Sequence, residues 1–206
     1  MEKSITNTIE RIESLFSKFN KEFYNGELIK PIITVYPDHR KRALGWCTSW
    51  KAWKETKKTK SDGYYEINIC AEHLERPFKE VAETLLHEMV HLYNIQIGVQ
   101  DTSRSGTYHN KKYKEAAEKH GLNVEKVEKY GWTKTNLNEE AKKFVESLKE
   151  TKFSLVRNEP MKITGNKKSS TRKYICPSCG CIVRATKEVN IICADCKETF
   201  KEEVEN

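Results

Sequence analysis

Apolar residues recur every three or four positions in four segments of the chain, which is the spacing of one face of an α-helix. Gly26 follows the first of these segments and Gly98 the second, and glycine commonly stands just beyond a helix end. Pro77 lies in the expected first turn of the second helix, a position that tolerates proline. The pattern therefore predicts four helices, at residues 4–24, 77–97, 109–122 and 137–150.

Three further segments, between the first two predicted helices, contain the β-branched and aromatic residues that are typical of strands. They are residues 31–37 (PIITVYP), 43–50 (ALGWCTSW) and 64–74 (YYEINICAEHL). The lysine-rich stretch that joins the second to the third ends in Asp62-Gly63, which indicates a hairpin loop. Helices and strands in this order predict an α+β fold.

The remaining sequence indicates a second, smaller module. Residues 157–173 are polar and basic and have the composition of a linker, and five of the seven cysteines follow within residues 176–196. A chain of 206 residues is long enough for one ordinary domain and such a module. We expect a first domain at 1–135, a helix and basic linker at 136–173, and a cysteine module at 174–206.

Composition and charge narrow the class of protein. Hydrophobic residues make up 37% of the chain and charged residues 33%, and no apolar run approaches the length of a membrane span. The N-terminal sequence MEKSITNTIERIESLF lacks the apolar centre of a signal peptide, so we expect a cytoplasmic protein, or a nuclear one in a eukaryote. In such a reducing compartment the cysteines indicate metal binding rather than disulfides. The net charge of +7 modestly favours anionic partners.

The second predicted helix contains the sequence H-E-x-x-H, formed by His87, Glu88 and His91. Positions four apart lie on one face of a helix, so both imidazoles can bind one metal ion. Glu88 is displaced around the helix by one position, where it can take a proton from an attacking water molecule. The alternative is an amphipathic helix that carries two surface or capped histidines. We favour the metal site.

A catalytic zinc site usually has three protein ligands, so the chain must supply a third. Asn94 and Ile97 stand where the metzincin pattern requires glycine and histidine, which excludes that class. The two glutamates of the next predicted helix project roughly away from the face that carries its first histidine. The candidates weighed for the third ligand are Asp101, His109, Glu115, Glu118 and His120.

His109 is the preferred third ligand. It follows a polar loop 18 residues after His91 and begins the next predicted helix, and a loop of that length can return the helix across the first. His120 shares a helix face with His109 but lies about 16 Å further along the axis, so only one of them can reach the ion. Beside Gly121 at the helix end, His120 is expected to interact with the helix dipole and to cap carbonyl groups.

The cysteine module contains two C-x-x-C pairs, Cys176 with Cys179 and Cys193 with Cys196, which thirteen residues separate. Four thiolates at this spacing predict a closed tetrahedral zinc site, a zinc ribbon, in preference to a redox pair. A β-hairpin fits between the pairs, and zinc would supply much of the folding free energy of so small a unit. The fifth thiol, Cys181, is expected to point away from the ion.

A basic and aromatic segment lies in the first domain. Residues 39–60 contain eight lysines and arginines against a single acidic residue, with three tryptophans among them. Lysines can bind phosphates and exposed indoles can stack on unpaired bases. The alternative is that Trp46 and Trp50 belong to the core and that the lysines only solvate a loop. The candidate nucleic-acid contacts are Trp53, as the ring most expected to be exposed, and Lys54, Lys57, Lys58, Lys167 and Lys168.

The order of these motifs strongly resembles the SprT-like zinc metalloproteases, the Spartan-like proteases, over about residues 1–132. The sequences that carry the resemblance are FNKEFYNGEL, GWC, YEINIC, TLLHEMVHLY and YHNKKYKEAAEKHGL. The resemblance implies a zincin-like fold in which His87, His91 and His109 bind zinc and Glu88 is the general base. It also implies substrates that are attached to DNA, and a cysteine module is common in the family. Asn110 departs from the glycine that often follows the third histidine.

We therefore predict a zinc-dependent endopeptidase with one catalytic and one structural zinc ion per chain. Its expected substrates are DNA-associated or DNA-crosslinked proteins, its nucleic-acid partner is DNA with single-stranded regions, and it is assumed to be a monomer without a membrane partner. Residues 64–70, taken as an exposed strand, would bind the substrate by strand addition. The rival interpretations are a DNA-binding or regulatory protein with a structural or weakly active zinc site, and a peptidase without a nucleic-acid partner.

Overall fold

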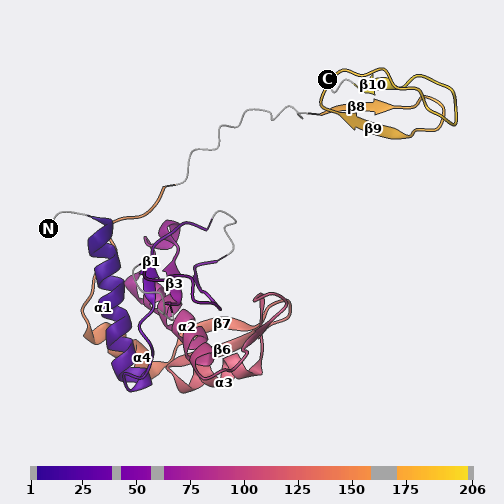
Figure 1. The fold of residues 1–206 in the computed structure, drawn as a ribbon. Coiled ribbons are helices and arrows are strands. Elements are labelled where there is room, and N and C mark those ends of the chain that lie inside the picture. The colour runs from indigo at the N-terminus through magenta and orange to yellow at the C-terminus, as the bar shows by residue number, and fades with distance from the viewer. Residues whose placement is uncertain (1–3, 39–42, 57–62, 159–170, 204–206) are drawn as a thin grey trace. The chain divides into compact units, whose positions relative to one another are not determined.

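A computed structural model describes residues 4–38, 43–56, 63–158 and 171–203. The chain divides into two compact units, Met1–Glu159 and Pro160–Asn206 (Figure 1). No helix among the described residues combines the length and the apolar character that crossing a bilayer requires.

The four predicted helices are all present in the first unit. They are α1 (Ile5–Tyr24), α2 (Phe78–Gln96), α3 (Lys111–Lys119) and α4 (Glu139–Ser147), and a short 3₁₀ helix (Ala71–His73) precedes α2. Side chains of Ser4, Asn110 and Asn138 accept hydrogen bonds from the first backbone N–H groups of α1, α3 and α4. Such caps satisfy donors that have no partner within the helix, which explains where these helices begin.

The three predicted strands form one sheet with the order β1-β3-β2. In this sheet β1 (Ile32–Thr34) is parallel to β3 (Glu66–Ile69), whereas β2 (Gly45–Cys47) is antiparallel to it. The prediction that residues 64–70 bind a substrate as an exposed strand is wrong. The central strand β3 is buried along its whole length and is paired on both sides, so the open edges of the sheet belong to β1 and β2.

A second sheet was not predicted. Its order is β4-β5-β7-β6, with β4 (Thr102–Ser103), β5 (Tyr108–His109), β6 (Leu122–Val127) and β7 (Gly131–Leu137). The sequence pattern predicts a loop at residues 98–108 and no element at the β6–β7 hairpin. Most side chains of β6 and β7 are exposed or half-buried, so the apolar pattern that announces a strand is weak there.

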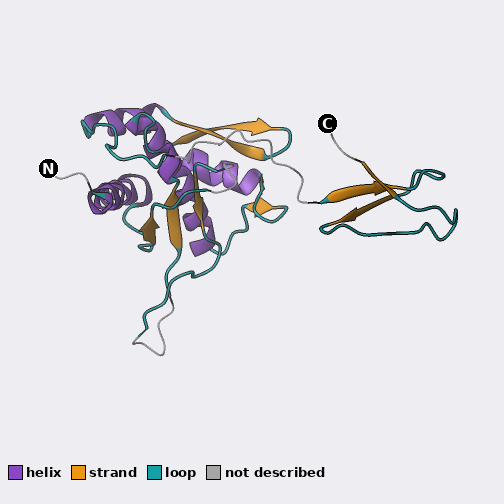
Figure 2. Cartoon of the chain, turned by 90° about the horizontal axis from the view of Figure 1, so that it is seen from above, coloured by secondary structure: helices purple, strands orange, loops and turns teal. Residues whose placement is uncertain are grey.

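The core of the first unit surrounds α2, which contacts α1, α3, α4 and strands of both sheets (Figure 2). Helix α4 belongs to this core, because Phe144 packs against Phe19 and Phe23 of α1. Beyond α4, the chain continues to Phe153, which is buried against Phe78. The first unit therefore includes the helix that the sequence analysis grouped with the linker.

The second unit is a three-stranded antiparallel sheet with the order β10-β8-β9. Its strands are β8 (Arg172–Ile175), β9 (Ile182–Ala185) and β10 (Lys201–Glu203). The buried core consists of Tyr174, Cys176, Cys193 and Phe200. Two of these four residues are cysteines, so packing alone supplies little stability here.

Candidate metal centres

Helix α2 holds the first two histidines of the candidate site. Its core side is formed by side chains with no solvent exposure, and they include Leu85, Leu86, Met89, Val90 and Leu92. Because this face is fixed in the core, the rotation of α2 about its axis is fixed as well. His87 and His91 therefore project together from the adjacent face, toward β5 and the start of α3.

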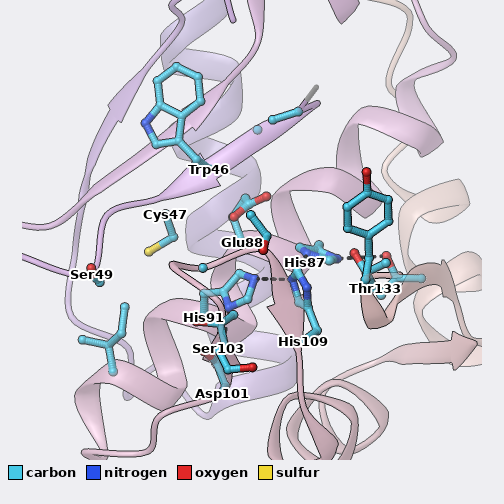
Figure 3. Close-up of a pocket in the computed structure, with 18 of the residues that line it drawn as sticks. Trp46, Cys47, Ser49, His87, Glu88, His91, Asp101, Ser103, His109 and Thr133 are labelled. Carbon is cyan, nitrogen blue, oxygen red and sulfur yellow. Dashed lines mark hydrogen bonds and ion pairs between the residues drawn. The ribbon is translucent and has the colours of Figure 1, made fainter. Parts of the chain in front are cut away.

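Three histidine side chains converge at one point (Figure 3). The Nε2 atom of His109 lies 3.2 Å from Nε2 of His87 and 3.0 Å from Nε2 of His91. A tetrahedral zinc ion with Zn–N bonds of about 2.0–2.1 Å holds its nitrogen ligands about 3.3 Å apart. The structure thus places the three predicted ligands at almost the spacing that one such ion requires.

The protonation of the rings agrees with a cation between them. Nδ1 of His91 donates a hydrogen bond of 2.7 Å to Oδ2 of Asp101, so a neutral His91 presents a lone pair at Nε2. Nδ1 of His87 lies 3.1 Å from the hydroxyl of Thr135 on β7, which can accept its proton and so leave the lone pair at Nε2. Facing lone pairs repel one another unless a cation lies between them, so the donor set fits a metal ion such as zinc.

Burial and neighbouring charges set the pKa values of the three rings. Burial lowers the pKa of His87 well below its ordinary value, and the adjacent His91 acts in the same direction. Burial also lowers the pKa of His109, to about 4. Burial opposes charge on His91 too, but the hydrogen bond to Asp101 and the negative charges of Asp101 and Glu88 together outweigh it and raise the pKa. His87 and His109 are therefore neutral near pH 7, which is the form that binds metals.

Glu88 lies beside the three rings and is buried (Figure 3). Burial raises the pKa of its carboxyl group to about 7, and this rise is limited first by the nearby His91 and then by the backbone N–H of Cys47, which donates to the carboxylate. A methyl group added to Gly45 would lie 3.4 Å from Cγ of Glu88, so strand β2 passes directly over this side chain. A carboxyl group with a pKa near neutrality can both accept and return a proton.

The site opens into a cleft. One wall is residues 43–47 and the chain that follows β2, with Trp50 at its end, and the floor is α2. The opposite wall is the turn between β4 and β5, residues 102–107, together with residues of β7 such as Thr133 and Thr135. The three histidines and Glu88 lie within this cleft, so an external molecule can reach them.

The other candidates for the third ligand have different positions. Oδ2 of Asp101 accepts hydrogen bonds from Nδ1 of His91 and from the side-chain amide of Asn94. Asp101 therefore supports one histidine and is not itself a member of the three-histidine group. Glu115 and Glu118 are exposed on α3, as their helix positions predicted.

The prediction for His120 is correct about the helix end but wrong about its partner and charge. His120 caps α3, yet its ring donates from Nδ1 to the carbonyl of Phe23 in α1 and stacks on Tyr24. Burial lowers its pKa, so the neutral ring is favoured over the cation that a helix dipole would stabilise.

The tryptophans are arranged differently from the prediction. Nε1 of Trp46 and Nε1 of Trp53 both donate to the carboxylate of the buried Glu66, over 3.0 and 2.7 Å. Trp53 is exposed, as predicted, at 39%, but Trp50 is more exposed, at 65%. Two indoles are thus hydrogen-bonded to one carboxylate, whereas the third, Trp50, lies at the rim of the cleft. Lys54 is exposed, and Lys57, Lys58, Lys167 and Lys168 lie outside the described residues.

The four predicted cysteine ligands form a second cluster. Cys176, Cys179, Cys193 and Cys196 bring their Sγ atoms within 4.8 Å of one another, and the exposed Cys181 is not a member of this group. Backbone N–H groups of Cys179 and Ser178 lower the pKa of Cys176 to about 7, which favours the thiolate that metals bind. The first unit thus holds a three-histidine group and the second unit a four-cysteine group.

Sequence reasoning missed the residues around the histidines. Thr135 lies on a strand that was not predicted, and Tyr113 underlies all three imidazoles. A signal for Tyr113 existed, since it lies four positions after His109 and such residues share a helix face.

Comparisons with known proteins give one match. The model of the SprT-like family matches residues 12–136, which include all three histidines and Glu88 and exclude the cysteine unit. No curated protein and no solved structure matches the chain.

Proposed function

The chain belongs to the SprT-like family, and from this premise we propose that its first unit is a zinc-dependent endopeptidase. One observation carries the proposal: three imidazole nitrogens converge on one point beside a buried carboxyl group, in a cleft that is open to an external chain. A structural zinc site is usually enclosed by four protein ligands, whereas a site with three ligands leaves a position for chemistry.

Each residue of the site has its own role in the proposed hydrolysis of a peptide bond. Zinc, when bound by His87, His91 and His109, supplies a Lewis acid that polarises the peptide carbonyl and acidifies water. Glu88 accepts the proton of the attacking water molecule and delivers it to the leaving amine. Burial raises the pKa of this carboxyl group in the metal-free site, which favours acceptance of a proton. Asp101 keeps the proton of His91 on Nδ1 and so directs Nε2 toward the cleft.

The substrate that best fits the cleft is an extended polypeptide. The carbonyl of Leu44 accepts from the N–H of Cys70, and the N–H of Thr48 donates to the carbonyl of Glu66. The backbone groups of Gly45 and the carbonyl of Cys47 therefore face the open edge of β2, whereas the N–H of Cys47 donates to Glu88. An extended segment can add to this edge and pass over the histidines. A folded loop or a helix cannot form such a ladder, so unfolded or locally opened proteins are the proposed targets.

We further propose that these targets are proteins bound or crosslinked to DNA. The net charge of +7 supports an anionic partner, and the exposed Trp50 at the rim of the cleft can stack on an unpaired base. The second unit, if it binds zinc through its four thiolates, adds a rigid module that the chain can use for targeting.

The substitution Glu88→Gln tests the proposal. It removes the proton acceptor but leaves the three imidazoles, so we expect two zinc ions per chain and a fall in cleavage of a DNA-bound protein of about 100- to 10,000-fold. Glu115→Gln, an identical change at an exposed position of α3, is the matched control and keeps full activity.

Two outcomes would favour the rivals. If the zinc-loaded wild type cleaves no protein with or without single-stranded DNA, the chain is a DNA-binding or regulatory protein. If it cleaves proteins at a rate that neither DNA nor salt changes, it is a peptidase without a nucleic-acid partner.

A further inference from the structure

Tyr113 occupies an unusual position beneath the histidine site. It lies four residues after His109, on the face of α3 that turns toward α2, and it has no solvent exposure. Oδ1 of Asn110 accepts hydrogen bonds from the backbone N–H groups of Lys112 and Tyr113. The cap therefore fixes the first turn of α3, and with it the place where the Tyr113 side chain enters the core.

The ring of Tyr113 contacts all three imidazoles. The distances between ring centroids are 4.9 Å to His87, 4.7 Å to His91 and 4.6 Å to His109. Among the aromatic side chains of the described residues, no other contacts the three rings together. Contacts of this length and tilt restrict the orientation of each imidazole, because a rotated ring would collide with the phenol or lose its contact.

The three imidazoles differ in what else holds them. His91 is held by Asp101 and His87 by Thr135, each through its Nδ1 atom. Nδ1 of His109 is buried and has no hydrogen-bond partner among the described residues. Histidine ligands usually have such a partner, which fixes the orientation and the tautomer of the ring. The ring of His109 therefore depends on packing for its orientation.

Tyr113 provides that packing. Its ring meets His109 edge to face, with an angle of 84° between the planes, whereas its angles to His87 and His91 are 44° and 35°. We propose that Tyr113 is a positioning residue of the metal site, whose ring orients His109 in place of the missing hydrogen bond. The proposal rests on the proposed function insofar as the three histidines bind zinc.

The aromatic ring, and not the hydroxyl group, carries this role. The hydroxyl of Tyr113 lies 3.5 Å from the backbone carbonyl of His87, at the outer limit of a hydrogen bond. Phenylalanine would keep the ring contacts, whereas leucine would leave a cavity and methionine would fill the space with a flexible chain. The three substitutions therefore distinguish the contribution of the aromatic ring from those of the side-chain volume and of the hydroxyl group.

Zinc affinity of the full chain tests the role without any measurement of activity. The protein is dialysed against a graded series of zinc buffers, zinc per chain is counted, and the cysteine unit serves as an internal reference. We expect Tyr113→Leu and Tyr113→Met to weaken the histidine site by about 10- to 100-fold, as loss of a ligand's supporting partner does. Tyr113→Phe should stay within about threefold of the wild type.

A matched control distinguishes positioning from general packing. Phe19→Leu truncates an equally buried ring in the same core, away from the histidines, and should lower the unfolding temperature without a change in zinc affinity. Wild-type zinc affinity in both Tyr113→Leu and Tyr113→Met would overturn the proposal, as would an equal loss in Phe19→Leu. If Tyr113→Leu does not fold, Tyr113→Met decides. A failure of proteolysis in the wild type would leave these zinc measurements unaffected.

Discussion

The two candidate metal centres are built on opposite plans. The three histidines are attached to a fold that has its own large core, which surrounds α2 and involves both sheets of the first unit. The four cysteines make up much of the second unit's interior, where the buried core is only four residues, two of them ligands. We therefore expect a metal ion to be an addition to the first unit but a condition for folding in the second.

The same difference appears in the ligands' surroundings. His91 and His87 have partners in Asp101 and Thr135, and one side of the site faces a cleft. The cysteine group completes four positions by itself, which is the arrangement of a structural site. Under the proposed function, the first unit would use a metal for reaction and the second for stability, and the comparison shows that the two roles call for different surroundings of the ligands.

Removal of zinc should have the largest effect, and it should affect the folding of the two units differently. We expect a strong chelator to abolish amide protection in β8, β9 and β10, because zinc contributes about 10 kcal/mol or more to folding at a site of this kind. Amides of α2 and β3 should remain protected, since their burial does not involve the ion. Hydrogen exchange resolved by residue gives both results in one experiment. Persistent protection in the second unit without zinc, or simultaneous loss in both units, would contradict this plan.

The substitution Asp101→Asn should change the zinc affinity of one candidate metal centre and not of the other. It keeps the shape of the side chain but removes the negative charge that holds the proton on Nδ1 of His91, so the histidine site should lose about 10- to 100-fold in zinc affinity. The cysteine site should not change. Zinc per chain, counted across a series of zinc buffers, measures both affinities.

Asp195→Asn is the matched control for this change, because Asp195 is exposed and lies between two cysteine ligands of the other unit. It should alter neither site. An unchanged affinity of the histidine site in Asp101→Asn would show that the contact to His91 does not support the ligand.

The sequence was sufficient for the parts of this comparison that depend on local patterns. Helical spacing gave α2, and with it the common direction of His87 and His91. The C-x-x-C spacing gave the cysteine group, since each pair of ligands lies within one turn of chain. His109 was preferred over the other candidates because it begins the next predicted helix after a loop long enough to return that helix across α2.

What the sequence did not provide depends on contacts between distant segments. The exposure of residues 64–70 could not be judged, because strand order decides which strand of a sheet is central. The hydrogen bond of the Trp53 indole depends on Glu66, which lies 13 positions away on β3. The β6–β7 hairpin has few buried side chains, so its identity follows from backbone pairing that no apolar pattern records.

The substitution Gly45→Ala should have the smallest of these effects, and it tests how closely β2 must approach the histidine site. The added methyl group would lie 2.7 Å from the carbonyl oxygen of Asn68 and 3.1 Å from Cγ2 of Thr84. Because the first of these atoms is backbone, β2 must shift, at a cost of about 1–3 kcal/mol in the free energy of unfolding of the first unit. Zinc should still bind, since no ligand moves, but peptide cleavage should fall because β2 carries both the N–H that holds Glu88 and the open edge.

Gly98→Ala, whose methyl group meets no atom within 4 Å, is the control and should affect stability through its left-handed backbone while leaving cleavage intact. Thermal unfolding, zinc content and cleavage rate of the two variants give the answer, and full cleavage by Gly45→Ala would mean that the cleft does not require β2 in this position.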